Sequence, residues 1–343
     1  MRTPIKHDFR SDTVTRPGPA MRAAMASAEV GDDVFRDDPT VTRLEETLAE
    51  RFGKDAGVFL TSGTQSNLVA LMAHCGRGDE FIVGQQAHAY KWEGGGAAVL
   101  GSIQPQPLNN QPDGSLALQD IEEAIKPDDS HFARTRLLAL ENTIGGKVLS
   151  HEYMEAATAL ARRHGLATHL DGARIFNAAT ALKTPVATLA RPFDTVSVCL
   201  SKGLGTPVGS VLVGSAPLIA KARRTRKMLG GGLRQVGILA AAGLYALEHN
   251  VERLADDHAN AKALAEGLAS FSQLKVTMPD TNIVFVEVDG AIAEGFSAHL
   301  ASHGIGITSA YGATKQRWVT HLDVDRAAVE DALSAAKSFF ANR

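Results

Sequence analysis

TVSVCLSKGLGTPVGSVLVG, residues 195–214, contains two short apolar runs, 195–200 and 208–214, on either side of a glycine-rich loop. Runs of this length, bounded by glycine and polar residues, are typical of buried strands. Similar runs precede them: AGVFL (56–60), FIVG (81–84), AAVLGSI (97–103), RLLALEN (136–142) and ATHL (167–170). Helix-like stretches lie between several of these runs, such as 64–75 and 152–164. The alternation predicts an α/β fold with a mainly parallel central sheet and helices on both faces.

The last hundred residues have a different pattern. A long helical region, 216–228 and 234–270, is expected to break at 249–250. After it, three strand-like runs surround a helix near 291–302, and a final helix follows; the runs are KVTMP (275–279), NIVFVEV (282–288) and RWVTHL (317–322). We therefore predict two domains: a large domain over 1–248, which includes an N-terminal arm, and a small α+β domain over 249–343.

Composition excludes several classes of function. The chain has 343 residues and a net charge of −3, without long single-sign blocks, which argues against nucleic acid as a partner. Its two cysteines, Cys75 and Cys199, form no CxxC pair, so we predict neither disulfides nor a metal site and expect a reducing cytoplasm. No run reaches 18 apolar residues, and no apolar stretch follows the charged N-terminus, so neither a membrane span nor a signal peptide is expected.

Polar side chains follow the predicted strands, and in open α/β sheets ligands bind at the carboxyl ends of strands. Ser62, Gly63 and Thr64 come after the run 56–60 and begin a predicted helix. The hydroxyls and the free N–H groups of a helix start can hold a phosphate. The same residue types also form an ordinary helix N-cap, and both interpretations stay open for this loop.

An aspartate and a lysine occupy two further strand ends. Asp171 follows the run 167–170, where a mostly buried carboxylate needs a partner. That partner is a helix N-cap, Arg174 in an ion pair, or a protonated ring nitrogen of a ligand. Lys202 follows the run 195–200, where desolvation favours the free amine that a Schiff base requires. A lysine that snorkels outward is the ordinary alternative.

Histidines complete the set of candidates. His88 follows the run 81–84, and a flat imidazole at a strand end can stack on a planar cofactor or act as a base. A lone histidine is more often an ordinary surface or core residue, and the same two interpretations apply to His131. We interpret His169, inside a predicted strand, as structural.

The combination of these strand ends is more specific than its parts. A hydroxyl and glycine loop, a histidine, an aspartate and a lysine follow four predicted strands in chain order. Pyridoxal 5′-phosphate (PLP) uses all four, because it has a phosphate, a flat ring, a pyridine nitrogen that must stay protonated, and an aldehyde that bonds to a lysine. The sequence therefore predicts PLP as the cofactor.

Long motifs support this prediction. They make the sequence similar to the low-specificity and L-allo-threonine aldolases, in the aromatic amino acid β-eliminating lyase/threonine aldolase group of fold type I PLP enzymes. The similarity runs from Asp8 almost to the C-terminus. Its motifs are DFRSDTVTRP (8–17), VGDDVFRDDPTV (30–41), SGTQSNLVAL (62–71), HLDGARIFNA (169–178), CLSKGLGTPVGS (199–210), RKMLGGGLRQ (226–235) and VTHLDV (319–324).

The resemblance implies a role for each candidate residue. Lys202 would form the Schiff base, Asp171 would pair with the pyridinium nitrogen, and His88 would stack on the ring. The residues expected to bind the cofactor are Ser62, Gly63, Thr64, His88, Asp171, Arg174 and Lys202, with Lys227 and Arg234 supplied across a subunit interface. Those expected to bind the substrate are Ser11, Arg174 and Arg317 at its carboxylate and His131 near its β-hydroxyl. Either His88 or His131 is expected to act as the base.

The implied function is the reversible PLP-dependent cleavage of L-threonine, L-allo-threonine and related β-hydroxy-α-amino acids to glycine and an aldehyde. A cytoplasmic homotetramer, a dimer of dimers with shared active sites, is implied as well. Two positions depart from the family pattern: Phe35, where relatives commonly have tyrosine, and Ile144, where they commonly have histidine. We accordingly expect β-phenylserine as a further substrate. Two alternatives stay open: another PLP reaction, such as β-elimination, and a non-catalytic PLP-binding homologue.

Overall fold

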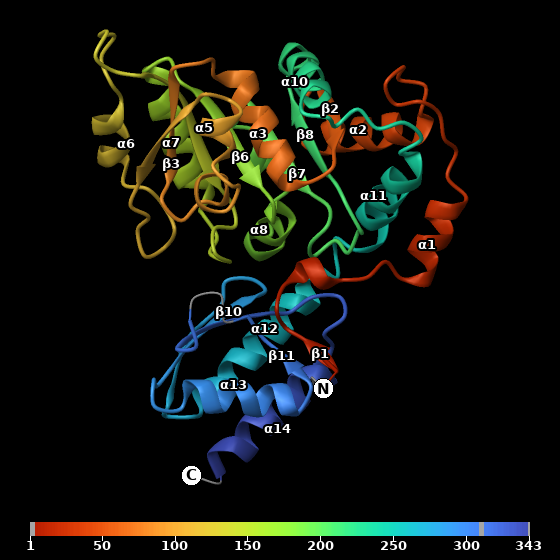
Figure 1. Cartoon of the computed structure of the whole chain (residues 1–343), viewed down its shortest axis with the longest axis vertical. Coiled ribbons are helices and arrows are strands. Elements are labelled where there is room, and N and C mark those ends of the chain that lie inside the picture. The colour runs from red at the N-terminus through yellow and green to blue at the C-terminus, as the bar shows by residue number, and fades with distance from the viewer. Residues whose placement is uncertain (1–3, 309–311, 342–343) are drawn as a thin grey trace.

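The computed structural model describes residues 4–308 and 312–341, and its centre is a seven-stranded sheet (Figure 1). The strand order is β2-β8-β7-β6-β5-β3-β4, and every pair from β7 to β4 is parallel, whereas β8 is antiparallel to both of its neighbours. A mainly parallel sheet is thus confirmed. Its strands are β2 (Ala56–Leu60), β3 (Asp79–Gly84), β4 (Gln104–Leu108), β5 (Arg134–Glu141), β6 (Ala167–Gly172), β7 (Thr195–Cys199) and β8 (Ser210–Gly214).

Helices pack on both faces of this sheet. Successive residues of a strand point to opposite faces. His169 of β6 bonds to Asn67 of α3, while the next residue, Leu170, joins the apolar core that contains Leu160 of α7. The helices of this part are α1 (Pro19–Ala26), α2 (Pro39–Arg51), α3 (Gly63–His74), α4 (His88–Lys91), α5 (Gly96–Val99), α6 (Leu118–Ala124), α7 (His151–Arg163), α8 (Ile175–Leu182), α9 (Val186–Ala190), α10 (Ala216–Met228) and α11 (Gly237–His249).

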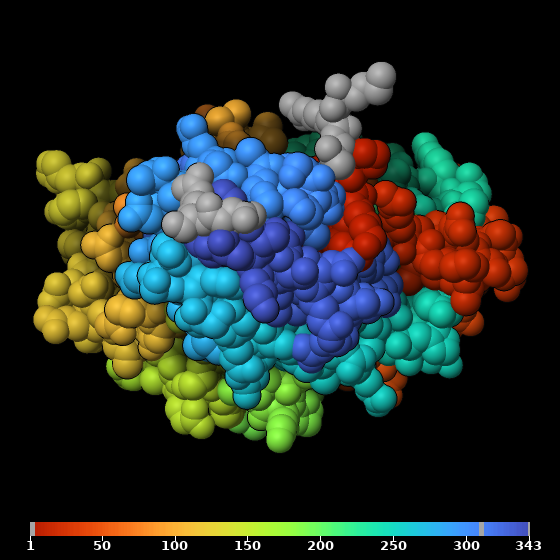
Figure 2. All heavy atoms as spheres, turned by 90° about the horizontal axis from the view of Figure 1, so that it is seen from below, coloured from red at the N-terminus to blue at the C-terminus, as the bar shows by residue number. Residues whose placement is uncertain are grey.

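A second apolar core lies in the C-terminal part. It is built on a three-stranded antiparallel sheet of order β12-β10-β9, and the predicted helix break at 249–250 is confirmed by the end of α11. Its elements are α12 (Leu254–Ala269), β9 (Leu274–Thr277), β10 (Ile283–Val288), α13 (Ala293–Ser302), β11 (Ile305–Gly306), β12 (Lys315–Val319) and α14 (Arg326–Ala341). Seen from below, this C-terminal part fills the centre of the molecular surface (Figure 2). The domain boundary near residue 248 stays a prediction.

The N-terminal arm joins the second core. Strand β1 (His7–Asp8) pairs with β11, and the ring of Phe9 packs edge-on against Trp318, with 5.5 Å between the ring centroids. After this, a short 3₁₀ helix, η1 (Asp12–Val14), leads back toward the large part of the molecule (Figure 1). Residues 7–9 therefore contact the small unit, although the sequence assigned the whole arm to the large domain.

The strand predicted at 97–103 is wrong. The structure has the short helix α5 there and then β4, which begins at Gln104. Val99 and Leu100 are exposed, so this apolar run does not mark a buried strand. Strand β4 lies at the edge of the sheet, where Pro105 is tolerated because an edge strand leaves one side of its backbone unpaired.

The carboxyl ends of the central parallel strands face the second unit. Glu141, the last residue of β5, lines the same cavity as Ile283 and Phe285 of β10. This junction is where the candidate residues of the sequence are expected to meet. Within residues 4–308 and 312–341, no helix combines the length and apolar character that crossing a bilayer requires.

Candidate active site

Three charged residues meet at the carboxyl ends of neighbouring strands. Glu141 on β5 lies opposite Asp171 on β6, and Lys202 follows the end of β7 by three positions. Burial, followed by the negative charge of Asp171, raises the pKa of Glu141 to about 7. The positive charges of Lys202 and His88 act in the opposite direction on the same carboxyl. The predicted aspartate and lysine are thus brought together, beside an acid that the sequence did not single out.

Asp171 is buried, and each of its carboxylate oxygens accepts one hydrogen bond. Its Oδ2 accepts from Nδ2 of Asn67 at 2.7 Å, and its Oδ1 accepts from the backbone N–H of Ala173 at 3.0 Å. Within the described part of the chain, the side chain of Arg174 forms no ion pair with Asp171 and bonds instead to Asp12. Of the three partners considered from the sequence, the ion pair with Arg174 is therefore absent within the described residues.

His88 begins the short helix α4 and is held at two points. Its backbone N–H donates to Oε2 of Glu141 at 2.7 Å, and its Nδ1 lies 2.8 Å from Oε1 of Glu93. The hydrogen bond to Glu93 raises the pKa of His88 above its ordinary value, against the effect of burial. The ring is 40% exposed and lines a cavity of about 290 Å³, so it is accessible to a ligand there.

The predicted anion loop lies at the start of α3. Ser62 caps this helix, because its Oγ accepts from the backbone N–H of Gln65 at 3.1 Å. The cap leaves the N–H groups of Gly63 and Thr64, which have no acceptor inside the helix, for another group. The buried Oγ of Ser210 has no hydrogen-bond partner within the described residues, and a Cβ placed on Gly63 would come within 3.8 Å of it. A bound phosphate would satisfy these donors.

Arg174 is clamped by an aspartate of the N-terminal arm. Its Nε and Nη2 donate to the two carboxylate oxygens of Asp12 at 2.7 and 2.6 Å, and Nδ2 of Asn282 reaches the same carboxylate at 3.3 Å. Burial alone would raise the pKa of Asp12, but Arg174, with Lys202 and Asn282, lowers it to about 2. Arm, large unit and small unit therefore meet at one ion pair.

The cavity beside His88 holds both predicted arginines. Its lining residues come from the two units: Gln86, His88, Trp92, Glu141, Gly145, Arg174, Ile283, Phe285 and Arg317. It continues into a second cavity of about 520 Å³, with which it shares Gln86, Trp92, Gly145 and Phe285. Ile144, one of the two departures from the family pattern, lines this second cavity. Ser11 caps the 3₁₀ helix next to Asp12 through its Oγ, which accepts from the N–H of Thr13 at 3.2 Å.

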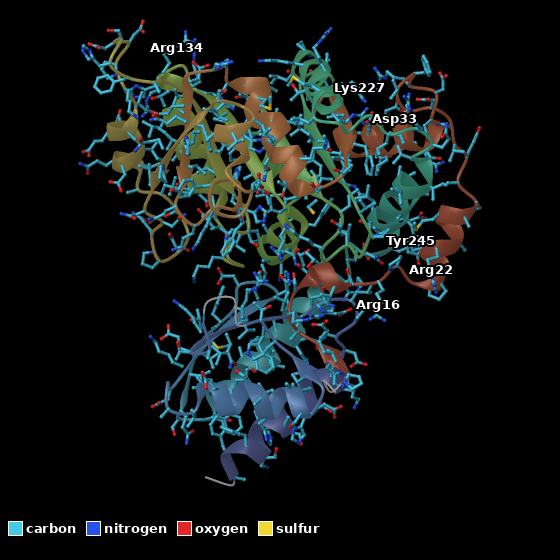
Figure 3. All side chains as sticks on the ribbon, in the orientation of Figure 1. Arg16, Arg22, Asp33, Arg134, Lys227 and Tyr245 are labelled. Atoms are coloured by element: carbon cyan, nitrogen blue, oxygen red, sulfur yellow. The ribbon has the colours of Figure 1, made fainter. Side chains whose placement is uncertain are left out.

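Four predicted or discussed residues lie elsewhere on the chain. His131 is 85% exposed and paired with Asp129, three residues before Arg134, the first residue of β5. Figure 3 shows Arg134 at the side of the large unit far from the small unit, which is also where Lys227 lies. Arg234 pairs with Asp32 at 3.4 Å, and Phe35 is exposed nearby in the chain. Within one chain, none of these residues lines the cavity that contains His88.

Sequence reasoning missed four residues of this site: Asp12, Asn67, Glu93 and Glu141. Glu141 ends a predicted strand, so the rule that located Asp171 also applied to it. Asp12 and Asn67 stand inside the motifs 8–17 and 62–71, but no local pattern shows what they bond to. Glu93 has no signal in the sequence, because its role depends on a contact with α3.

These residues fit PLP. A buried carboxylate, a lysine, an accessible imidazole and a helix start lie at one sheet edge. The Oγ of Ser210 beside Gly63, which has no partner in the part of the chain that the structure describes, suits a phosphate. The carboxylate of Asp171 suits a protonated pyridine nitrogen, since it accepts from Asn67 and the backbone and pairs with no cation among residues 4–308 and 312–341.

Known proteins resemble this chain over most of its length. The model of the beta-eliminating lyase family matches residues 8–291. The low specificity L-threonine aldolase of Escherichia coli (strain K12) is 52% identical over 97% of this chain and 99% of its own. Low-specificity L-threonine aldolase 1 of Arabidopsis thaliana is 49% identical over 87% and 86%. The solved structure of Leishmania major threonine aldolase superposes with a TM-score of 0.82 at 23% identity, over 97% of this chain and 99% of that one, which shows the shared fold.

Proposed function

The chain belongs to the beta-eliminating lyase family and is a PLP-dependent lyase, and we propose that it cleaves L-threonine and L-allo-threonine to glycine and acetaldehyde, reversibly. Related β-hydroxy-α-amino acids, β-phenylserine among them, are proposed as further substrates. The observation that carries the proposal is the meeting of Asp171, Lys202 and His88 at one sheet edge, in a chain 52% identical to a low specificity L-threonine aldolase.

The cofactor would be held by residues of the strand ends. Lys202 would bind it covalently, and Asp171 would accept a hydrogen bond from its protonated ring nitrogen. Ser62, Gly63 and Thr64 would hold its phosphate at the start of α3. Bound there, PLP supplies the electron sink that permits a bond at the substrate Cα to break.

Arginines of the two units would bind the substrate carboxylate. Arg174 and Arg317 line the same cavity, on opposite sides of the domain junction. Asp12 takes the N–H of Nε and one N–H of Nη2 of Arg174, so both N–H groups of Nη1 and the second N–H of Nη2 are left for a ligand. Ser11, which precedes Asp12, is proposed as a further contact of this carboxylate. A fixed carboxylate sets which bond at Cα stands perpendicular to the ring, and this choice selects cleavage between Cα and Cβ.

We propose His88 as the base that removes the proton of the β-hydroxyl group. The support is its position in the cavity and its 40% exposure. The departing aldehyde carries the β-substituent, and the second cavity, which Arg174 does not line, has room for an aromatic substituent. His131 would reach a site only in a neighbouring subunit.

The assembly is proposed to be a homotetramer with shared sites. Lys227 and Arg234 are positively charged and do not line the cavity that contains His88 of the same chain. Their position suits a role at the cofactor phosphate of a neighbouring subunit. A cytoplasmic location is proposed with it, since the two cysteines are free and buried.

Turnover of L-threonine and L-allo-threonine by the PLP-loaded enzyme, with glycine and acetaldehyde measured directly, tests the proposal. Equal amounts of the two products are expected, and Lys202→Ala should abolish them. Ammonia and 2-oxobutanoate in place of glycine would identify β-elimination instead. No product from four β-hydroxy amino acids would indicate a non-catalytic PLP-binding protein.

A further inference from the structure

A buried carboxylate links His88 to the aspartate of the cofactor site. Oε1 of Glu93 lies 2.8 Å from Nδ1 of His88 and 2.8 Å from Nδ2 of Asn67, and the same Nδ2 lies 2.7 Å from Oδ2 of Asp171. The side chain of Glu93 is 5% exposed, and it does not line the cavity that contains His88. Glu93 therefore acts on a ligand in that cavity through the imidazole.

The orientation of the Asn67 amide follows from its neighbours. Two carboxylates can only accept, so the amide must turn its NH₂ group, with one proton for each, toward Glu93 and Asp171. Its Oδ1 then faces Nε2 of His169 at 3.2 Å, and this nitrogen must carry a proton. Burial lowers the pKa of His169 to about 3, so the ring is neutral and its other nitrogen is an acceptor.

The pattern continues without conflict behind the site. Nδ1 of His169 accepts from the hydroxyl of Thr195 at 2.9 Å, and that hydroxyl in turn accepts from Nε2 of His74 at 2.8 Å. Every proton in this series has one consistent place, from α3 across β6 and β7. The amide of Asn67 is thus oriented by its two carboxylate neighbours, and its NH₂ group leaves Glu93 as an acceptor.

We propose that Glu93 is a positioning residue of the reaction, which holds the proton of His88 on Nδ1 and leaves Nε2 as the ring nitrogen that faces the substrate. A neutral imidazole has one donor and one acceptor nitrogen, so a proton fixed on Nδ1 makes Nε2 the base. The rotation of the ring is fixed by the same hydrogen bond. The inference rests on the proposed function for the identity of the proton that His88 removes.

The charges around His88 support this role. Glu93 faces the ring from the segment after α4, Asp171 from β6, Glu141 from β5 and Lys202 from the loop after β7. Of these, the hydrogen bond to Glu93 has the largest effect in raising the pKa of His88. Removing the charge of Glu93 should therefore lower that pKa and weaken the hydrogen bond that holds the Nδ1 proton, while the cavity keeps its lining.

Nuclear magnetic resonance of the histidine rings tests the proposal directly, in the wild-type holoenzyme and in the cofactor-free protein. His88→Asn identifies the signals of His88. Above its pKa, we expect the wild-type ring to carry its proton on Nδ1 in both forms, and this needs no substrate and no active enzyme. A wild-type ring protonated on Nε2 would overturn the proposal even if threonine is cleaved, so its failure is distinct from failure of the proposed function.

Glu93→Gln provides the kinetic test. We expect a lower pKa of His88, an acid limb of the kcat/KM profile moved to lower pH, and kcat reduced about 10- to 100-fold with little change in KM. Glu93→Asp keeps the charge and should retain the wild-type acid limb. Glu122→Gln makes the same chemical change at an exposed pair, in which Glu122 lies 3.1 Å from His164. It should leave the titration of His88 and the pH profile of kcat/KM unchanged. An unchanged ring titration in Glu93→Gln would refute the proposal.

Discussion

Asp12 occupies two of the hydrogen-bonding nitrogens of Arg174, with distances of 2.6 and 2.7 Å between the charged groups. The carboxylate is fully buried, and the guanidinium nearly so. A substrate carboxylate would therefore bind an arginine whose guanidinium is already held by the carboxylate of Asp12. Because Asp12 fixes the plane of the guanidinium, it decides which donors remain for the ligand.

Replacing this partner should damage both folding and binding. Asp12→Asn leaves the charge of Arg174 buried without its counter-charge, which we expect to lower the free energy of unfolding by roughly 3–5 kcal/mol. The KM for L-threonine should rise as well, because the guanidinium is no longer held in one plane. Urea denaturation and initial rates measure the two effects. Asp8→Asn, at an exposed pair with Arg10 on the same arm, is the control and should change stability by less than about 1 kcal/mol.

The same pair predicts an acid limit of stability. The pKa of Asp12 is lowered to about 2 in the fold, below its value in the unfolded chain. Its contribution, about 2 kcal/mol, is fully present above the unfolded pKa near 4 and is lost as the pH falls through 2. Unfolding curves of the wild type and Asp12→Asn should converge in this window. A difference between them that stays constant down to pH 2 would contradict the assignment.

The raised pKa of Glu141 predicts that stability depends on pH in the opposite direction. Its pKa is raised to about 7, so the folded protein binds this proton more tightly than the unfolded chain does. The cofactor-free protein should therefore lose stability as the pH rises from 4.5 to 7, by up to about 3 kcal/mol. Glu141→Gln keeps an acceptor for the N–H of His88 and should remove this loss. Identical pH dependence in the variant and the wild type would show that Glu141 is not the group responsible.

Asp171→Asn should reduce kcat about 100-fold or more, with a smaller effect on KM. The amide cannot supply the negative charge that keeps a pyridine nitrogen protonated, and it offers hydrogens where Asn67 already donates. Stopped-flow rates at saturating substrate measure the effect. Asp113→Asn, an exposed aspartate in a turn, is the control. If the Asp171 variant kept its wild-type rate, the residue would have a packing role alone.

The position of Trp92 predicts that it influences which β-substituents the enzyme accepts. It lines both the cavity of His88 and the larger one behind it, where an aromatic group would extend and a methyl group would not. Trp92→Ala should lower kcat/KM for β-phenylserine about 10-fold more than for L-threonine, through lost aromatic contact. Phe132→Ala, which removes an exposed ring near His131, should leave the ratio unchanged. Equal losses for both substrates would mean that the substituent lies elsewhere.

Mixing two inactive variants tests the shared sites. Lys202→Ala lacks the lysine of its own site, and Lys227→Ala lacks the cation proposed to act in a neighbour. A mixed dimer contains one site with neither change, so refolding an equal mixture should restore roughly a quarter of the wild-type activity. The mixture should stay inactive if Lys227 acts within its own chain.

Much of the fold follows from sequence patterns. The apolar runs at 56–60, 167–170 and 195–200 are strands because each is short, buried on both faces and bounded by polar residues. The run at 97–103 has a similar apolar composition, but only Ala97 and Ile103 join the core while Val99 and Leu100 are exposed. A sequence window does not record which side chains a neighbouring element covers. Strand β4 was missed for the converse reason, since its prolines argue against a strand unless it lies at an edge.

The site was predictable where one rule about strand ends applies, as for Asp171 and Lys202. It was not predictable where function depends on pairs far apart in the chain. Asp12 and Arg174 are joined by an ion pair, and Asn67 on α3 bonds to Glu93 in the segment after α4. No periodicity or local motif encodes such contacts, because each depends on how the elements pack.

The pairing of β1 with β11 has a consequence for biosynthesis. His7 of β1 pairs with Ile305 of β11. The first strand is therefore synthesised at the beginning of translation, but it cannot pair until β11 has been synthesised near the end. Asp12 lies four residues after β1 and holds Arg174. A nascent chain can therefore complete its central sheet before the arginine that is proposed to bind the substrate carboxylate is held in place. Ribosome-bound chains that lack residue 305 should therefore be compact but inert, and competence should appear late, after release of the whole polypeptide.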